Sequence, residues 1–352
     1  MIFIGANHIL FLSVKILMLI FVGLGIGGEE SLTLEGLKEL KEADEIYAEF
    51  YTSPLPKLDF AHLQELAGKK IQVLRREDLE DGEEILRKAS VKRVVLLVPG
   101  DPMVATTHVS LRLRAAERGI CTKVVHSSSI VSAVVGLTGL QSYKFGKSAT
   151  VPLGQKSVHP YEVMGENLKR GLHTLLLLDV KAEEGVFMSA REALTYLLQL
   201  EKELQRGYLT EERLAVVVAR AGSDDCLVRG NTVGELVKMD FGPPPHALVI
   251  PGRLHFMEEE ALRVFAQVPD FVIERHRSLR LSGLEETLTN EIEKWTQKLE
   301  EKIEPLKGMK ELENIYAYLT DSKFFREKGD LIKSFECVIW AWALFKQLKG
   351  ES

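Results

Sequence analysis

The sequence is poor in cysteine, with three in 352 residues, and they stand far apart at Cys121, Cys226 and Cys337. No two of them form a CxxC pair, so neither a disulfide framework nor a zinc site is expected. We interpret each thiol as a small apolar core residue, which indicates a reducing compartment and predicts a cytoplasmic protein. The sequence also lacks the HExxH and GxSxG signatures, and no metal site is predicted.

An excess of basic residues is also missing. The chain has 45 Lys and Arg against 51 Asp and Glu, which gives a formal net charge of -6. A general nucleic-acid binder would carry a strong positive balance, so nucleic acid is not expected as a partner. The hydrophobic fraction of 45% is enough for a normal core, and the length suggests two or three domains.

No long uninterrupted apolar run is present, although the N-terminus is very hydrophobic. Asn7, His8 and Lys15 interrupt this segment, which leaves no clean apolar span of about 18 residues. A basic region followed by an apolar core, as in a signal peptide, is not found either. We expect residues 1–17 to be an N-terminal extension and the first domain to begin at Met18, with no membrane partner. A membrane anchor remains the alternative.

Short apolar runs alternate with helical patterns through most of the chain. The apolar runs at 19–22 and 94–98 and the predicted strand at 122–125 are each followed by a loop of small and polar residues. This alternation is typical of an α/β fold with a mostly parallel sheet, in which ligands bind beyond the carboxyl ends of the strands. We therefore expect the three loops to converge at one edge of one sheet. The predicted α/β domains span 18–114 and 115–275.

The first of these loops is rich in glycine, from Gly23 to Gly28. Glycines permit a sharp strand-to-helix turn and let a ligand approach the backbone closely. The spacing fits GxGxxG, but the acidic residue expected about 20 positions later has only loose matches in Asp44 and Glu45. A nucleotide-type site and a plain tight turn both remain open at this point.

Three further segments offer candidate binding side chains. Asp101 lies in a proline-flanked turn after a buried strand, where a rigid carboxylate can accept bonds from an amine or a hydroxyl. A helix N-cap is the alternative role for Asp101. The serines at 127–129 offer hydroxyls and backbone donors, or simply cap a helix. His246 follows three prolines and is either a ligand contact or an ordinary surface or core residue.

The C-terminal part of the chain has a different residue pattern, typical of amphipathic helices. Apolar residues recur at three- and four-residue steps over 284–303, and two similar stripes follow. Three amphipathic helices with short connections predict a helical bundle over 284–350. Exposure of Trp340 and Trp342 would indicate a partner surface there, and a solvated accessory domain is the alternative.

Several of these segments, in this order and at matching spacing, resemble the diphthine synthases. The likeness extends from residue 18 to about residue 275 and is carried by GLGIG, AEFYTS, PGDPMVATTH, HSSSI, YKFGKSAT, RGLHTLLLLDVKA, ARAGS and FGPPPHALVIPGRLH. The tail instead resembles a small uncharacterised archaeal helical domain through KIEPL and FFREKGDLIKSFECVIWAWAL. That second likeness implies no activity.

The first resemblance implies a two-domain, tetrapyrrole-methylase-like fold. In that fold S-adenosylmethionine lies in the cleft between two α/β domains, usually in a homodimer. The resemblance also implies which residues contact the cofactor, and most of them fall in the loops described above. The matching positions are Ile26, Asp101, Val104, Ser129, Ile130, Leu178, Ala221 and His246. A catalytic residue that accepts a proton is not identified.

The implied reaction is methylation of a modified histidine on translation elongation factor 2. That histidine already carries an aminocarboxypropyl group, whose amine receives the methyl to give diphthine. Two loops, at 27–30 and 152–160, depart from the family pattern, so the resemblance specifies the cofactor more closely than the acceptor. The rival hypotheses are a methyltransferase of the same fold acting on a tetrapyrrole or another small molecule, and a non-catalytic binding protein acting through its helical tail.

Overall fold

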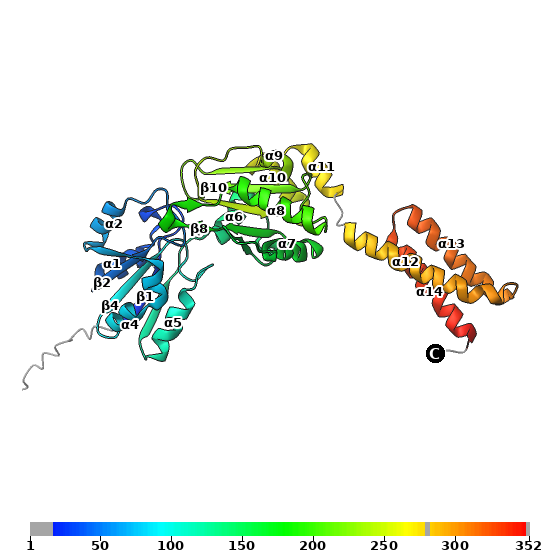
Figure 1. The fold of residues 1–352 in the computed structure, drawn as a ribbon, viewed down its shortest axis with the longest axis horizontal. Helices are drawn as coiled ribbons and strands as arrows, with labels where there is room; N and C mark the ends of the chain where they lie inside the picture. The colour runs from blue at the N-terminus through cyan, green and yellow to red at the C-terminus, as the bar shows by residue number, and fades with distance from the viewer. Residues whose placement is uncertain (1–16, 279–281, 350–352) are drawn as a thin grey trace, which may run out of the picture.

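A computed structural model describes residues 17–278 and 282–349 of the chain. Figure 1 shows two adjacent α/β domains followed by a separate group of three helices, as predicted. The expected N-terminal extension and its alternative as an anchor fall on residues outside this description, apart from Leu17. Within the part of the chain that is described, no helix has the length and apolarity needed to cross a membrane.

The first domain is a five-stranded parallel sheet with the strand order β3-β2-β4-β1-β5. Its strands are β1 (Met18–Gly23), β2 (Glu45–Glu49), β3 (Ile71–Leu74), β4 (Arg93–Val98) and β5 (Cys121–Val125). Its helices are α1 (Leu34–Glu42), α2 (Phe60–Ala67), α3 (Arg76–Asp81), α4 (Glu83–Ala89) and α5 (His108–Glu117).

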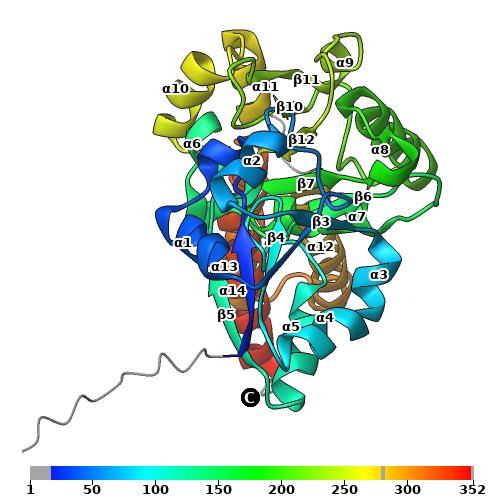
Figure 2. The same ribbon diagram turned by 90° about the vertical axis from the view of Figure 1, so that its left-hand side faces the viewer.

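Helices cover both faces of this sheet, which explains why its central strands are apolar throughout. Leu19 and Phe21 pack on the side of α4 and α5, whereas Ile20 and Val22 pack on the side of α1 and α2. Successive side chains of a strand point to opposite faces, so a strand buried on both sides needs a continuous apolar run. Figure 2 shows the helices on the two sides of the sheet.

The structure corrects the predicted boundary between residues 114 and 115. Strand β5 pairs in parallel with β1, from Met18 opposite Cys121 to Val22 opposite Val125, so it belongs to the first sheet. We therefore place the end of the first domain after Val125. The same pairing puts β4, β1 and β5 side by side, which confirms that the loops after these three strands meet at one edge.

The second domain is a mixed sheet with the order β11-β10-β12-β7-β6, in which only the β6–β7 pair is parallel among the described strands. Its strands are β6 (Ala149–Val151), β7 (Thr174–Leu178), β10 (Leu214–Ala219), β11 (Leu227–Thr232) and β12 (His246–Ile250), with a small β8–β9 hairpin (Val180–Lys181, Val186–Phe187) beside them. Its helices are α6 (Ile130–Thr138), α7 (His159–Lys169), α8 (Ala190–Leu204), α9 (Val233–Leu236), α10 (Phe256–Phe265) and α11 (Asp270–Ser278). Apolar cores lie on both faces of this sheet.

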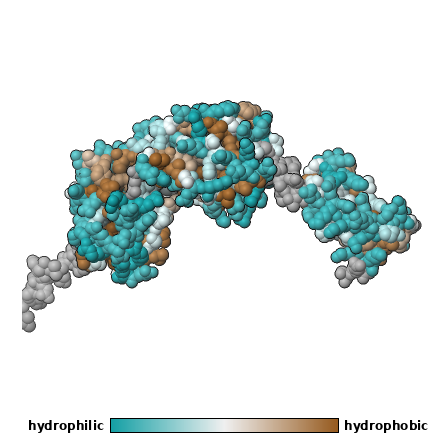
Figure 3. Space-filling model, in the orientation of Figure 1, coloured by the Kyte–Doolittle hydropathy of each residue, from teal (hydrophilic) through white to brown (hydrophobic). Residues whose placement is uncertain are grey.

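The tail consists of α12 (Ser282–Ile303), α13 (Glu313–Glu327) and α14 (Leu331–Lys349). The three helices share one small core, which includes Leu299 of α12, Ile315 of α13 and Phe345 of α14. Trp340 is 60% exposed, whereas Trp342 packs against this core. Figure 3 shows a mostly hydrophilic face with hydrophobic patches over both α/β domains.

Candidate active site

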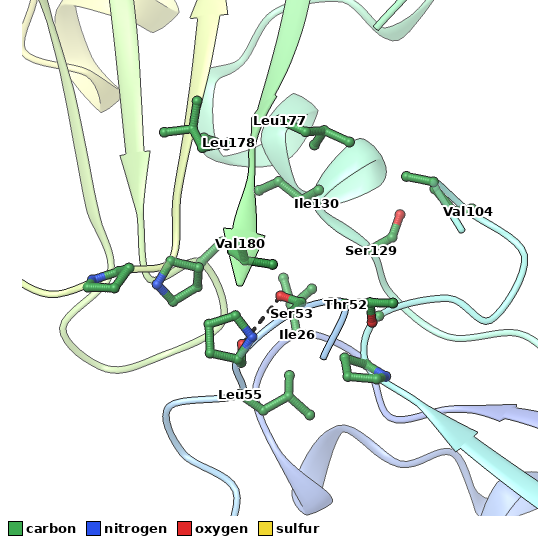
Figure 4. Close-up of a pocket in the computed structure, with 18 of the residues that line it drawn as sticks. Ile26, Thr52, Ser53, Leu55, Val104, Ser129, Ile130, Leu177, Leu178 and Val180 are labelled. Carbon is green, nitrogen blue, oxygen red and sulfur yellow. Dashed lines mark hydrogen bonds between the residues drawn. The ribbon is translucent and has the colours of Figure 1, made fainter. Parts of the chain in front are cut away.

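A pocket lies between the two α/β domains, walled by loops that follow β1, β2, β4 and β5 and by residues of the second domain. The eight positions implied by the resemblance all line this pocket. They are Ile26, Asp101, Val104, Ser129, Ile130, Leu178, Ala221 and His246. Residues from six separate segments of the chain therefore meet at one place (Figure 4).

Gly25 and Gly100 join the loops that follow β1 and β4. The Gly25 amide donates to the Gly100 carbonyl at 3.1 Å, and the Gly100 amide donates back to the Gly25 carbonyl at 2.8 Å. A Cβ on Gly25, where φ is 72°, would lie 2.7 Å from the Ser31 Cβ. A Cβ on Gly222 would lie 2.8 Å from the Ile26 carbonyl carbon. Glycine at these positions thus lets Ile26 pack against the second domain at the pocket wall.

Asp101 connects the loop after β4 to the loop after β5. Its Oδ1 accepts a bond from the Met103 amide at 2.9 Å, and its Oδ2 accepts one from the Ser127 amide at 3.2 Å. The His126 Nδ1 lies 2.8 Å from the same Oδ2. The helix N-cap considered for Asp101 is not what forms, because α5 begins only at His108. Asp101 instead holds a turn while its carboxyl group borders the pocket.

The start of helix α6 forms another part of the wall. Ser129 is buried and precedes Ile130, the first residue of the helix, and the Ser129 amide donates to Ser132 Oγ at 3.3 Å. Amides in the first turn of a helix lack intrahelical partners and favour negative groups nearby. Val104, in the same loop as Asp101, also lines the pocket (Figure 4).

The second domain contributes Leu178 at the end of β7, Ala221 after β10 and His246 at the start of β12. His246 Nδ1 accepts a bond from the Ala190 amide at 3.1 Å, so its Nε2 carries the proton and donates to the Pro243 carbonyl at 3.1 Å. Burial lowers the pKa of His246, which keeps the imidazole neutral. Both ring nitrogens are therefore engaged, Nε2 by the proline turn and Nδ1 by the first residue of α8.

Some lining residues had no role in the sequence prediction. Thr52, Ser53 and Leu55 follow β2 and line the pocket from the first domain (Figure 4). Met188 lines it from the second domain. The AEFYTS segment was part of the family likeness, but no residue of it was assigned to the site. Since β2 pairs with β4, the loop after β2 is a neighbour of the Asp101 loop, and strand order would have identified it.

Thr52 is hydrogen-bonded to a buried acid, Glu49. Glu49 is the last residue of β2, is 0% exposed, and accepts bonds from the Thr52 hydroxyl at 2.6 Å and the Thr52 amide at 3.2 Å. Burial raises the pKa of Glu49 to about 7 against the opposing effect of these bonds. His108 Nε2 lies 3.8 Å from the carboxyl group, and burial lowers the pKa of His108.

The described residues contain no group of three or more His, Cys, Asp or Glu side chains placed to hold a metal ion. Two lining residues of the pocket, Asp101 and His246, have titratable side chains.

The fold and the pocket define a methyltransferase of the tetrapyrrole-methylase class. Residues 18–237 match the family described as "Tetrapyrrole (Corrin/Porphyrin) Methylases". Within this class the chain belongs to the diphthine synthase family. A diphthine synthase of Methanothermobacter thermautotrophicus is 44% identical over 261 residues, which cover 73% of this chain and 99% of the relative. One of Methanocaldococcus jannaschii is 46% identical over 256 residues, covering 71% and 99%.

Solved structures agree with this assignment. A crystal structure of diphthine synthase superposes with a TM-score of 0.67 at 41% identity and covers 74% of this chain and 99% of its own. A putative diphthine synthase from Entamoeba histolytica gives a TM-score of 0.66 at 34% identity and covers 72% and 99%. The tail, at 285–349, matches a family described as "Protein of unknown function (DUF357)".

Proposed function

We propose that this methyltransferase uses S-adenosylmethionine to methylate the amine of the aminocarboxypropyl-modified histidine of translation elongation factor 2. The product is diphthine, and the reaction belongs to diphthamide biosynthesis. The observation that carries the proposal is the meeting of all eight implied contacts in one interdomain pocket. The near-complete coverage of relatives named diphthine synthase supports the choice of acceptor. We place the reaction in the cytoplasm, where translation takes place.

The lining residues suit the charges of S-adenosylmethionine. Asp101 is the one carboxylate among the described lining residues, which include no Lys or Arg, so a sulfonium meets no like charge from the pocket wall. Leu177, Val218 and Ala247 provide an apolar wall for an adenine. The start of α6 favours a negative group such as a carboxylate. We propose that the eight residues named above hold the cofactor.

The chemistry needs little from the protein beyond placement. Bound S-adenosylmethionine supplies an activated methyl group on a sulfonium. The pocket residues orient the acceptor nitrogen and exclude water, which is how a site accelerates transfer between two bound groups. The neutral His246 adds no charge that would repel the sulfonium.

We also propose that the chain assembles as a homodimer. Helices α10 and α11 carry exposed apolar side chains, a composition that favours a protein contact. They are Phe256, Met257, Val264, Phe265 and Phe271. Sedimentation velocity checks the assembly, with the mass of two chains expected and the mass of one chain contradicting it.

Methyl transfer tests the proposed function. The purified protein is incubated with S-adenosylmethionine and an archaeal elongation factor 2 that carries the aminocarboxypropyl group, and the histidine peptide is weighed by mass spectrometry. We expect one or more methyl groups on this peptide and none on a matched factor with unmodified histidine. Cofactor binding without transfer would mean that the enzyme methylates another acceptor. The absence of cofactor binding would contradict the proposal altogether.

A further inference from the structure

The proposed reaction leaves a proton that some group has to accept. Aliphatic amines are protonated at neutral pH, and each methylation of a neutral amine again produces a positively charged nitrogen. One proton therefore leaves for every methyl group added. This inference rests on the proposed function and concerns where that proton goes.

The two titratable groups that line the pocket are poorly placed to take it. Both nitrogens of His246 are engaged by Ala190 and Pro243, so a proton gained would break the bond that Nδ1 accepts. The Asp101 carboxylate already accepts two amide bonds and lies beside His126. Protonation there would loosen the loop that Asp101 holds.

Glu49 lies one hydroxyl group away from the pocket. The Thr52 hydroxyl donates to Glu49 Oε1 at 2.6 Å, and Thr52 itself lines the pocket. A hydroxyl that donates to a carboxylate keeps its lone pairs for a donor on the other side. A protonated amine in the pocket can therefore donate to the same Thr52 oxygen, which places the amine and the carboxylate at the two ends of a short hydrogen-bond chain.

His108 is a second buried neighbour of the Glu49 carboxyl group. His108 Nε2 lies 3.8 Å from Glu49 Oε1 and, although buried, has no hydrogen-bond partner. Its Nδ1 lies 2.8 Å from the hydroxyl of Thr106, another residue of the pocket wall. The groups that face Glu49 are thus Thr52, His108, the Tyr51 amide and, by charge alone, Arg76.

The protonation state of Glu49 suits this position. Burial raises the pKa of Glu49 to about 7, despite the bonds from Thr52 and Tyr51 and the charge of Arg76, which lower it. Burial also lowers the pKa of His108, so the histidine is neutral and contributes no charge to the pair. A carboxyl group that titrates near neutral pH can both take up and release a proton there.

We propose that, before each methyl transfer, Glu49 accepts the proton of the protonated acceptor amine through the hydroxyl of Thr52. The amine N–H bond breaks and leaves its electron pair on nitrogen, the proton passes to Thr52 Oγ1, and the former hydroxyl proton moves to Glu49 Oε1. Thr52 touches the substrate. Glu49 is a positioning residue that orients the Thr52 hydroxyl and stores the proton, which returns to solvent by the same route after product release.

Three variants test this relay by methyl transfer to the modified elongation factor 2 over a range of pH. Glu49→Gln keeps an oxygen for Thr52 but cannot take a proton, and Thr52→Val removes the hydroxyl at nearly constant shape. Both are expected to slow transfer by about 10- to 100-fold near neutral pH. The loss should shrink toward about pH 9.5, where more of the free amine is already neutral. Thr52→Ser restores a hydroxyl at the same position and should recover a rate well above that of Thr52→Val.

Two readouts separate this relay from a purely structural role. Calorimetry should give unchanged cofactor affinity in Glu49→Gln, because Glu49 lies outside the pocket lining. Infrared titration of the wild type should reveal a carboxylic-acid band that fades as pH rises through about 7 and is missing in Glu49→Gln. A loss of equal size at every pH, or wild-type activity of Thr52→Val, would overturn the inference. A wild type that methylates nothing would instead refute the proposed function. If Glu49→Gln does not fold, the comparison of Thr52→Val with Thr52→Ser tests the relay.

Discussion

Asp101 joins two loops of the first domain through a single carboxylate. Its partners are the amides of Met103 and Ser127 and the ring of His126, whose side chain is 71% exposed. A buried carboxylate with several donors costs more to remove than an exposed partner of the same bond. The loop geometry and the negative charge at the pocket therefore depend on Asp101 far more than on His126.

Replacing Asp101 by Ala should weaken S-adenosylmethionine binding by at least about tenfold, because the charge and the loop contact are lost together. His126→Ala is the matched control, and it should bind within about twofold of the wild type because both amide bonds remain. Calorimetric titration measures both affinities. Equal losses in the two variants would show that the exposed ring, and not the buried carboxylate, fixes the loop.

Glu258 is the centre of a buried hydrogen-bond network in the second domain. It is 0% exposed and accepts bonds from Lys144, from His173 Nε2 at 2.9 Å and from the amides of Gln141 at 2.9 Å and His255 at 2.8 Å. Burial alone would raise the pKa of Glu258, but the bond from Lys144 and the other donors lower it to about 2. Because the buried carboxylate already accepts from four donors, we assign Glu258 a structural role.

Glu258→Gln should lower the free energy of unfolding by about 3 kcal/mol at neutral pH, because it leaves Lys144 without its counter-charge. A lowered pKa stabilises the fold above the unfolded value of 4.5, and this stabilisation is lost as pH falls from there through about 2. Urea unfolding should thus give a difference from wild type that narrows in acid. Glu203→Gln, in an exposed pair with Lys156, should cost at most about 0.5 kcal/mol. A pH-independent difference would contradict the role of the Glu258 charge.

Sequence motifs identified the pocket residues that belong to recognisable loops, such as Asp101 and His246. They did not identify Glu49, because an acid at the end of EIYAE is indistinguishable in sequence from an ordinary surface charge. Its burial arises from packing against His108, which is 59 positions later in the chain. Contacts of this kind depend on tertiary structure and not on local pattern.

At the scale of elements, the pocket depends on loops that meet because their strands are neighbours. The loops after β1 and β4 exchange two hydrogen bonds through Gly25 and Gly100. Gly25 has φ 72°, and a Cβ there would lie 2.9 Å from Ser128 Oγ in the loop after β5. One glycine thus lets all three loops pack together.

Gly25→Ala should therefore abolish measurable cofactor binding, because the added methyl group forces the three loops apart. Gly68→Ala is the matched control: it has a similar φ of 65°, but nothing lies within 4 Å of its Cβ position. We expect this control to lose about 1 kcal/mol of stability from backbone strain and to bind normally. Thermal unfolding and calorimetry measure both effects. Normal binding by Gly25→Ala would contradict the packing argument.

The elements themselves were predictable, but their assignment to sheets was not. A strand was predicted at residues 122–125, and β5 does form there. Its pairing with β1 skips almost a hundred residues, so chain order placed it in the wrong domain. The convergence of the loops was nevertheless predicted correctly, because parallel strands share the edge at which their carboxyl ends lie.

At the scale of the whole molecule, the helical tail stands apart in sequence and in structure. The diphthine synthase relatives are matched over 97–99% of their length by 71–73% of this chain, which leaves the tail unmatched. The three tryptophans of the sequence, Trp295, Trp340 and Trp342, all lie in the tail. Tryptophan fluorescence therefore reports on this helical unit alone.

This arrangement predicts two separable unfolding transitions. A ligand that binds only the folded state raises the stability of the domain that holds it. Addition of S-adenosylmethionine should thus raise the transition of the α/β domains, which hold six of the eight tyrosines, and leave the tryptophan fluorescence transition unchanged. A joint shift of both transitions would mean that the tail and the methyltransferase domains unfold as one unit.

The central claim is that the interdomain pocket holds the methyl donor, and a crystal structure with bound S-adenosylhomocysteine tests it most directly. We predict density for the ligand between the two α/β domains, in contact with Ile26, Asp101, Ile130 and Ala221. Its sulfur should lie on the side of the pocket that Thr52 lines. Ligand density elsewhere on the molecule, with this pocket filled only by water, would contradict the account.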